Sequence, residues 1–81
     1  MPKVDPRMIL AEFFDSRGKA TPADNDDLFE KGIVDSMDLL ELVAFLEERH
    51  GIAIEQEQMS ADNFRSIGNI AALITRAAAT P

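Results

Sequence analysis

Cysteine is absent from this 81-residue sequence, and histidine occurs once. Without cysteine the chain has no disulfide framework and no thiol of its own. Its large apolar residues occur in spaced groups, so no segment is long enough to span a bilayer. The N-terminal stretch also lacks the apolar core of a secretory signal. We therefore expect a cytoplasmic protein that does not insert into a membrane.

Basic residues are scarce as well, because 8 Lys and Arg stand against 15 Asp and Glu, for a net charge of −7. Such a surface repels nucleic acid and anionic membranes and favours encounter with basic partners. A net negative charge is equally typical of a small domain whose charge only keeps it soluble. With 46% apolar residues the chain can build one core. We expect a single domain over residues 1–81 and a monomer.

Apolar residues at helical spacing predict an all-α fold. We expect a small four-helix bundle with three main helices, one short third helix, and a long loop between helices one and two. The first helix is predicted from residue 6 to residue 15 or 16, after an Asp5 cap. The second is predicted from residue 36 to residue 49 or 50, and Gly51 closes it.

Residues 19–34 form the long loop, which Leu28 and Phe29 are expected to anchor to the bundle. The acid-rich segment 24–27 lacks the glycine and the terminal glutamate of a calcium-binding loop, so no metal site is predicted. A short third helix is expected at 60–64, with Phe64 in the core. The fourth helix is expected to follow a Ser66 cap.

Ser36 stands between Asp35 and Asp38 at the start of the second helix. Its hydroxyl is expected on the surface, at the positive end of the helix dipole and near four unpaired backbone N–H groups. That position suits a serine that carries a phosphate, which the two aspartates would repel and direct outwards. The same aspartates predict a start that resembles a capping box. The simpler alternative is that Ser36 only caps the helix.

A Ser–His–acid hydrolase is the first catalytic alternative for Ser36. The sole histidine, His50, lies about 21 Å further along the same helix at 1.5 Å per residue, so it cannot act as the base. A bundle of this size also has little room for a cleft that buries a substrate. His50 is interpreted as a boundary residue that packs its ring and faces the helix's negative end. No catalytic residue and no enzymatic activity are predicted.

Asp35-Ser36-Met37, opening an acidic amphipathic helix, resembles the Asp-Ser-Leu motif of acyl carrier proteins. By length and helix order the resemblance covers residues 6–76, and its specific part is 28–54. Met37 replaces the leucine usual in fatty-acid members and is also seen in D-alanyl carriers. His50 stands where many members have phenylalanine. These departures favour a specialised, discrete carrier.

The resemblance implies that a phosphopantetheinyl transferase attaches 4′-phosphopantetheine from coenzyme A to Ser36. The arm would supply a thiol that holds acyl or aminoacyl groups as thioesters. An activating ligase would load them, and acyl-transferring enzymes with basic docking surfaces would receive them. The resemblance also implies a cavity between helices two and three. Cargo and pathway stay open among fatty acid, polyketide and nonribosomal peptide biosynthesis and cell-wall modification.

The resemblance also implies a recognition surface on and beside the second helix. Carried over by position, it comprises Asp35, Met37, Asp38, Leu40, Glu41, Ala44, Glu47 and Glu48. The helical period places Asp38, Glu41 and Glu48 opposite the apolar stripe, whereas Phe45 points away from the stripe for no reason visible within the helix. The alternative function is a non-catalytic acidic interaction module without a prosthetic group.

Overall fold

The computed structural model describes residues 5–79, which form three α-helices and two 3-10 turns. The helices are α1 (Pro6–Ser16), α2 (Ser36–His50) and α3 (Ile67–Ala79), and the turns are η1 (Gln56–Gln58) and η2 (Asp62–Phe64). No strand occurs within the described range. The all-α prediction is confirmed, although the short third helix is only the single turn η2. Over the same residues, no helix combines the length and apolarity needed to cross a bilayer.

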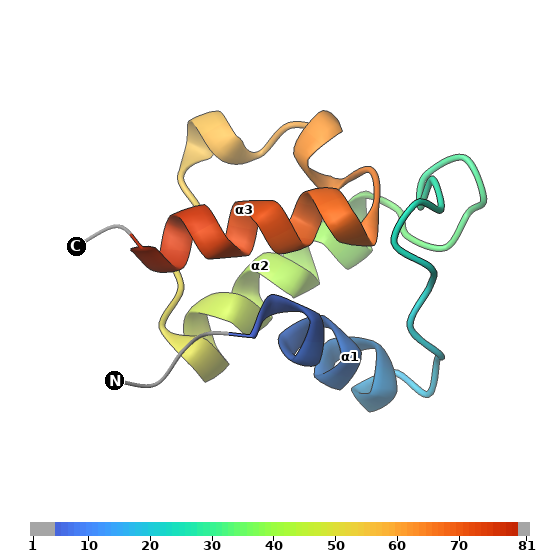
Figure 1. The fold of residues 1–81 in the computed structure, drawn as a ribbon, viewed down its shortest axis with the longest axis horizontal. Helices are drawn as coiled ribbons and strands as arrows, with labels where there is room; N and C mark the ends of the chain where they lie inside the picture. The colour runs from blue at the N-terminus through green and yellow to red at the C-terminus, as the bar shows by residue number, and fades with distance from the viewer. Residues whose placement is uncertain (1–4, 80–81) are drawn as a thin grey trace.

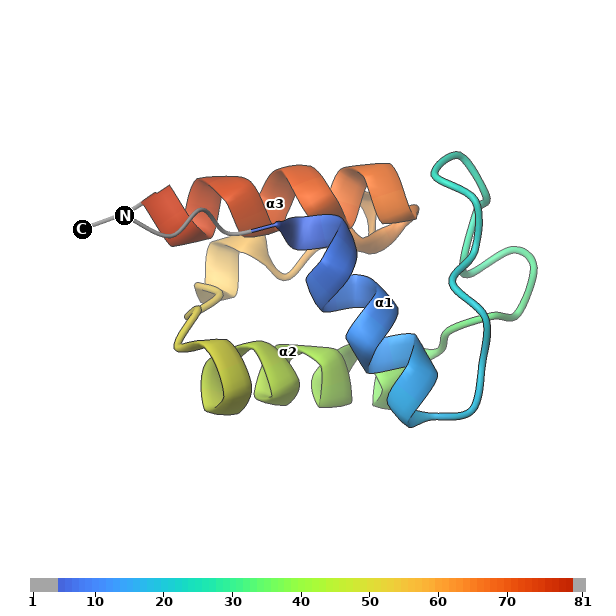
Figure 2. The same cartoon turned by 60° about the horizontal axis from the view of Figure 1, so that its bottom comes forward.

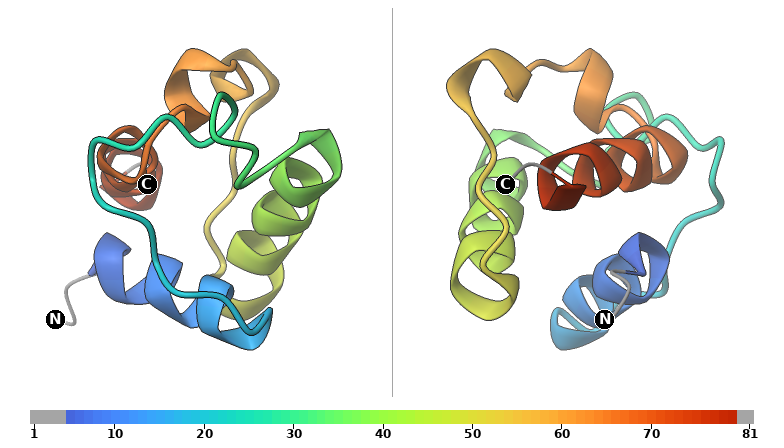
Figure 3. Two further views of the ribbon diagram at one scale, coloured as in Figure 1. Left: turned by 90° about the vertical axis from the view of Figure 1, so that its right-hand side faces the viewer. Right: turned by 60° about the vertical axis from the view of Figure 1, so that its left-hand side comes forward.

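The three helices surround a common interior (Figure 3). In Figure 2, α3 runs along the top and α2 along the bottom, with α1 inclined between them. The long loop that joins α1 to α2 lies at one end of the bundle, on the right in Figure 1. The two 3-10 turns lie on the side opposite α1. The start of α2 therefore lies at the same end of the molecule as the loop.

The helix boundaries follow from local capping. The Asp5 carboxylate accepts hydrogen bonds from the N–H groups of Arg7 and Met8, at 3.2 and 3.3 Å. Gly51 ends α2 with a positive φ of 64°, which a residue without Cβ adopts readily. The Ser66 hydroxyl accepts from the third N–H of α3, at 3.2 Å. The predicted starts of all three main helices and the predicted ends of α1 and α2 are confirmed.

The core is made of apolar side chains from all three helices and from the connections between them. They are Ile9, Leu10, Phe13, Phe14, Leu28, Leu42, Leu46, Ile52, Ile54, Phe64, Ile67, Ile70, Ala71, Leu73 and Ile74. Among the described residues, no polar or charged one is fully buried. Phe64 is buried as predicted. The burial of apolar surface therefore supplies the main favourable term in folding.

Leu28 anchors the long loop. Its side chain is fully buried, and its N–H donates to the Arg65 carbonyl at 2.7 Å. Its own carbonyl accepts from the N–H groups of Ile33 and Val34, at 2.8 and 3.2 Å. Phe29 is half-buried and packs against the core. The predicted anchor is confirmed, and it fixes the chain shortly before α2 begins.

The carboxylates of the acid-rich loop segment form ion pairs and hydrogen bonds with neighbouring groups. Asp24 pairs with Arg7 at 2.5 Å, and Asp26 pairs with Lys31 at 2.8 Å. These hydrogen-bonded cations lower the pKa of both carboxyls. Asp27 accepts from a main-chain N–H at 2.9 Å. The segment therefore ties the loop to α1 and to itself.

Candidate functional site

Ser36 is exposed and is the first residue of α2. Asp35 occupies the N-cap position, where its carboxylate accepts from the Asp38 N–H at 3.0 Å. The alternative in which Ser36 only caps the helix is therefore wrong. Within residues 5–79 the Ser36 hydroxyl has no hydrogen-bond partner. It is free to react with a molecule that approaches from solvent.

Asp35 and Asp38 form a reciprocal capping box at the start of α2. The Asp35 N–H donates in turn to the Asp38 carboxylate, at 3.1 Å. Two of the four N–H groups at the helix start are thus paired, so the expectation of four unpaired groups is wrong for these two. The hydrogen bond from the Asp38 N–H lowers the pKa of Asp35. An ionised carboxylate therefore stands beside Ser36 and would turn an attached phosphate outwards.

Apolar side chains lie on the exposed face of α2 beside Ser36. Met37 is 65% exposed and Leu40 is 56% exposed, although both are large apolar residues. Ala44 is also exposed, and at 100° per residue it falls between the other two. A continuous exposed apolar strip is typical of a surface that contacts other molecules. This strip begins at Met37, directly after Ser36.

The predicted recognition surface is mostly accessible. Seven of its eight residues are exposed, and the exception is Asp38, which is half-buried. The Asp38 side chain is 17% exposed, whereas that of Glu41 is 51% exposed. Glu47 and Glu48 are exposed further along α2. The structure thus places acids beside the apolar strip, with Asp38 turned toward α1.

Arg17, which follows the last residue of α1, contacts this surface and had no predicted role. One guanidinium nitrogen lies 2.5 Å from the Asp38 carboxylate, and another pairs with Glu41. The hydrogen bond to Glu41 is the main cause of a raised Arg17 pKa. The guanidinium carbon also lies 5.2 Å from the centre of the Phe13 ring. No sequence pattern links Arg17 to these acids, because its partners are more than twenty residues away.

The contacts at the far end of α2 explain the orientations of the Phe45 and His50 side chains. The Phe45 ring meets Phe13 edge-on at 5.4 Å and His50 at 5.5 Å between ring centres. His50 Nε2 lies 3.0 Å from a Glu12 carboxylate oxygen. Phe45 therefore points toward α1, and His50 packs its ring as predicted. Ser36 and His50 are the first and last residues of α2, so the histidine cannot act as the base of Ser36.

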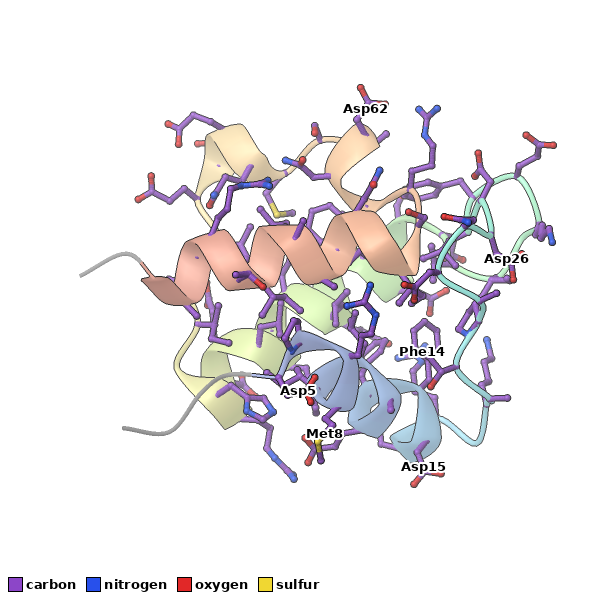
Figure 4. All side chains as sticks on the ribbon, in the orientation of Figure 1. Asp5, Met8, Phe14, Asp15, Asp26 and Asp62 are labelled. Carbon is purple, nitrogen blue, oxygen red and sulfur yellow. The ribbon has the colours of Figure 1, made fainter. Side chains whose placement is uncertain are left out.

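A surface hollow lies on the outer side of α1. It is lined by Met8, Ala11, Glu12, Asp15, Lys19, Ala20 and Thr21. Figure 4 shows Met8 and Asp15 on this outer side. The hollow involves no residue of α2 or of the turns, so it is distinct from the cavity that the resemblance implies between the second and third helices. That cavity stays a prediction.

Comparison with known protein families identifies the domain. A family model described as a phosphopantetheine attachment site matches residues 7–74, which is most of the chain. Comparisons with curated proteins and with solved structures gave no match. The prosthetic group of such a domain is covalently attached 4′-phosphopantetheine, and domains of this kind are generally carriers that do not catalyse. With its helical fold and its exposed serine at the start of α2, the chain belongs to the phosphopantetheine-attachment family of carrier domains.

Proposed function

We propose that this chain is a discrete acyl or aminoacyl carrier protein and that Ser36 is its attachment residue. The observation that carries the proposal is the exposed Ser36 hydroxyl, which stands unpaired at the tip of α2. The apolar strip and the exposed acids begin at the same point and give an enzyme a surface to bind. The group attached there would supply a thiol, which the cysteine-free chain lacks and which holds the cargo as a thioester.

Attachment requires a simple exchange of bonds. The Ser36 oxygen forms a bond to the phosphorus of coenzyme A that is next to pantetheine. The pyrophosphate bond breaks, and adenosine 3′,5′-bisphosphate leaves with the electron pair. The hydroxyl proton passes to a base of the transferase, because His50 lies at the other end of α2. Ser36 thus needs exposure and correct positioning more than activation within the chain.

Docking to partner enzymes is proposed to use the outer face of α2. Met37, Leu40 and Ala44 would make the apolar centre of the contact, with Glu41, Glu47 and Glu48 around it. Exposed ion pairs contribute only about 0.2–1 kcal/mol each, which suits a carrier that must leave each partner quickly. Their larger effect is on orientation and association rate. Phosphopantetheinyl transferase, an activating ligase and acyl-transferring enzymes are the proposed partners.

The test is modification in vitro. The folded protein is incubated with coenzyme A and a broad-specificity phosphopantetheinyl transferase, and its intact mass is measured. One phosphopantetheine adduct is expected on the wild type and on Ser60→Ala, which removes another exposed serine, and none on Ser36→Ala. Absence of an adduct on the folded wild type contradicts the proposal and favours an acidic interaction module. An adduct that persists in Ser36→Ala contradicts the assignment of the residue.

A further inference from the structure

Arg17 contacts the surface proposed to meet basic partners. It pairs with both Asp38 and Glu41, which are two of the acids nearest to Ser36. A partner that presents lysine or arginine to the start of α2 therefore meets acids already engaged by a cation of the same chain. These acids offer such a partner less attraction than their number suggests.

The position of Arg17 is fixed from the α1 side. It is the C-cap of α1, and its guanidinium stacks over the ring of Phe13, whose side chain is buried in the core. Its side chain is only 29% exposed. The cation is therefore held beside α2 by the packing of α1, so its charge stays close to the start of α2 when the molecule is free.

Other ion pairs of the described residues lie away from the start of α2. Arg7 pairs with Asp24 in the long loop, and Arg49 pairs with Glu12 on α1. Glu47 and Glu48, by contrast, are exposed and have no ion pair within residues 5–79. The acids of α2 thus differ in their pairing, because Asp38 and Glu41 share the single cation of Arg17, whereas Glu47 and Glu48 face no cation within the described residues.

We propose that Arg17 regulates docking by competing with basic side chains of partner enzymes for Asp38 and Glu41. This inference rests on the proposed carrier function, because it concerns the same surface. A partner binds productively either by displacing Arg17 or by directing its cations to Glu47 and Glu48 while it covers the apolar strip. Arg17 is thus a specificity-determining residue that disfavours partners whose cations reach only the start of α2.

The experiment measures kcat/KM for phosphopantetheinyl transfer to the wild type, Arg17→Met and Arg7→Met at low and high salt. Methionine keeps an apolar stem near the position of the lost charge, and both variants change the net charge from −7 to −8. Arg17→Met is expected to react about three- to tenfold faster than Arg7→Met at low ionic strength. The difference should disappear near 1 M salt, where the Debye length falls to about 3 Å.

A double-mutant cycle with Glu41→Gln separates competition from a structural effect. If Arg17 masks Glu41, adding Glu41→Gln should lower kcat/KM by a larger factor in the Arg17→Met background than in the wild type. Equal slowing in both backgrounds overturns the inference, as does an Arg17→Met rate no higher than that of Arg7→Met. If Arg17→Met does not fold, Arg17→Gln takes its place, and thermal unfolding verifies folding in each case. A wild type that accepts no adduct refutes the carrier function, whereas a loaded wild type with equal variants refutes only the role of Arg17.

Discussion

The two faces of α2 contain similar residues but make different contacts. Leu46 is fully buried and Leu42 nearly so, whereas Leu40 is more than half exposed on the other face. Burial of apolar area contributes roughly 25 cal/mol per Å², so the inner leucines stabilise the fold and the outer one adds little to it. An exposed apolar side chain such as that of Leu40 can still stabilise a complex with a partner protein. One helix therefore supports the fold with one face and presents a binding surface with the other.

The largest expected effect is on the inner face. Leu46→Ala should lower the free energy of unfolding by about 2–5 kcal/mol, because it leaves a cavity in the core. A small domain has little more stability than that to lose. Urea unfolding followed by circular dichroism measures the change. Leu40→Ala is the matched control, and its change should stay within about 0.5 kcal/mol. Equal losses of unfolding free energy in the two variants would show that the two faces of α2 contribute equally to stability.

The outer face should show the opposite pattern. Leu40→Ala is expected to lower kcat/KM for phosphopantetheinyl transfer several-fold while the unfolding midpoint in urea stays unchanged, because the side chain contacts solvent in the free protein. Steady-state kinetics at fixed coenzyme A measures this effect. Thr75→Ala, an exposed position on α3, serves as the control and should leave the rate unchanged. A normal rate in Leu40→Ala would remove this residue from the proposed docking surface.

The inner face and the helix ends could be predicted from the sequence because their causes are local. Asp5, Gly51 and Ser66 cap helices through groups within a few residues, and the buried leucines of α2 recur at helical spacing. The short third helix was less predictable. A segment of about five residues has little cooperativity to hold an α-helix, and it forms a 3-10 turn that buries Phe64.

The outer surface was harder to predict because its details depend on α1. Asp38 was assigned to the exposed acids, yet it turns toward Arg17, and Phe45 turns toward Phe13. Both contacts join segments that meet only in the folded chain. The N-cap was also ambiguous, since Asp35 and Ser36 both favour that position. Reciprocal bonding with Asp38 gives the position to Asp35 and leaves the serine free.

The smallest expected effect concerns Asp35, which is the N-cap of α2. Its pKa is lowered in the folded protein by hydrogen bonds to its carboxylate, chiefly from the Asp38 N–H. Its charge therefore stabilises the fold above the ordinary carboxyl value of 3.8, and this contribution is lost as the pH falls through the lowered folded pKa. Asp35→Asn keeps the shape and an oxygen acceptor but removes the charge. Its melting temperature should lie slightly below that of the wild type at neutral pH.

The difference in melting temperature between the wild type and Asp35→Asn should shrink as the pH drops below 3.8. Glu48→Gln removes an equal charge from the exposed face, so it reports the background effect of net charge alone. Circular dichroism melts from neutral to acidic pH give both curves. If the two variants behave alike at every pH, the Asp35 charge affects stability only through the net charge and does not stabilise the helix start. If only Asp35→Asn converges with the wild type in acid, this carboxylate stabilises the helix that presents Ser36.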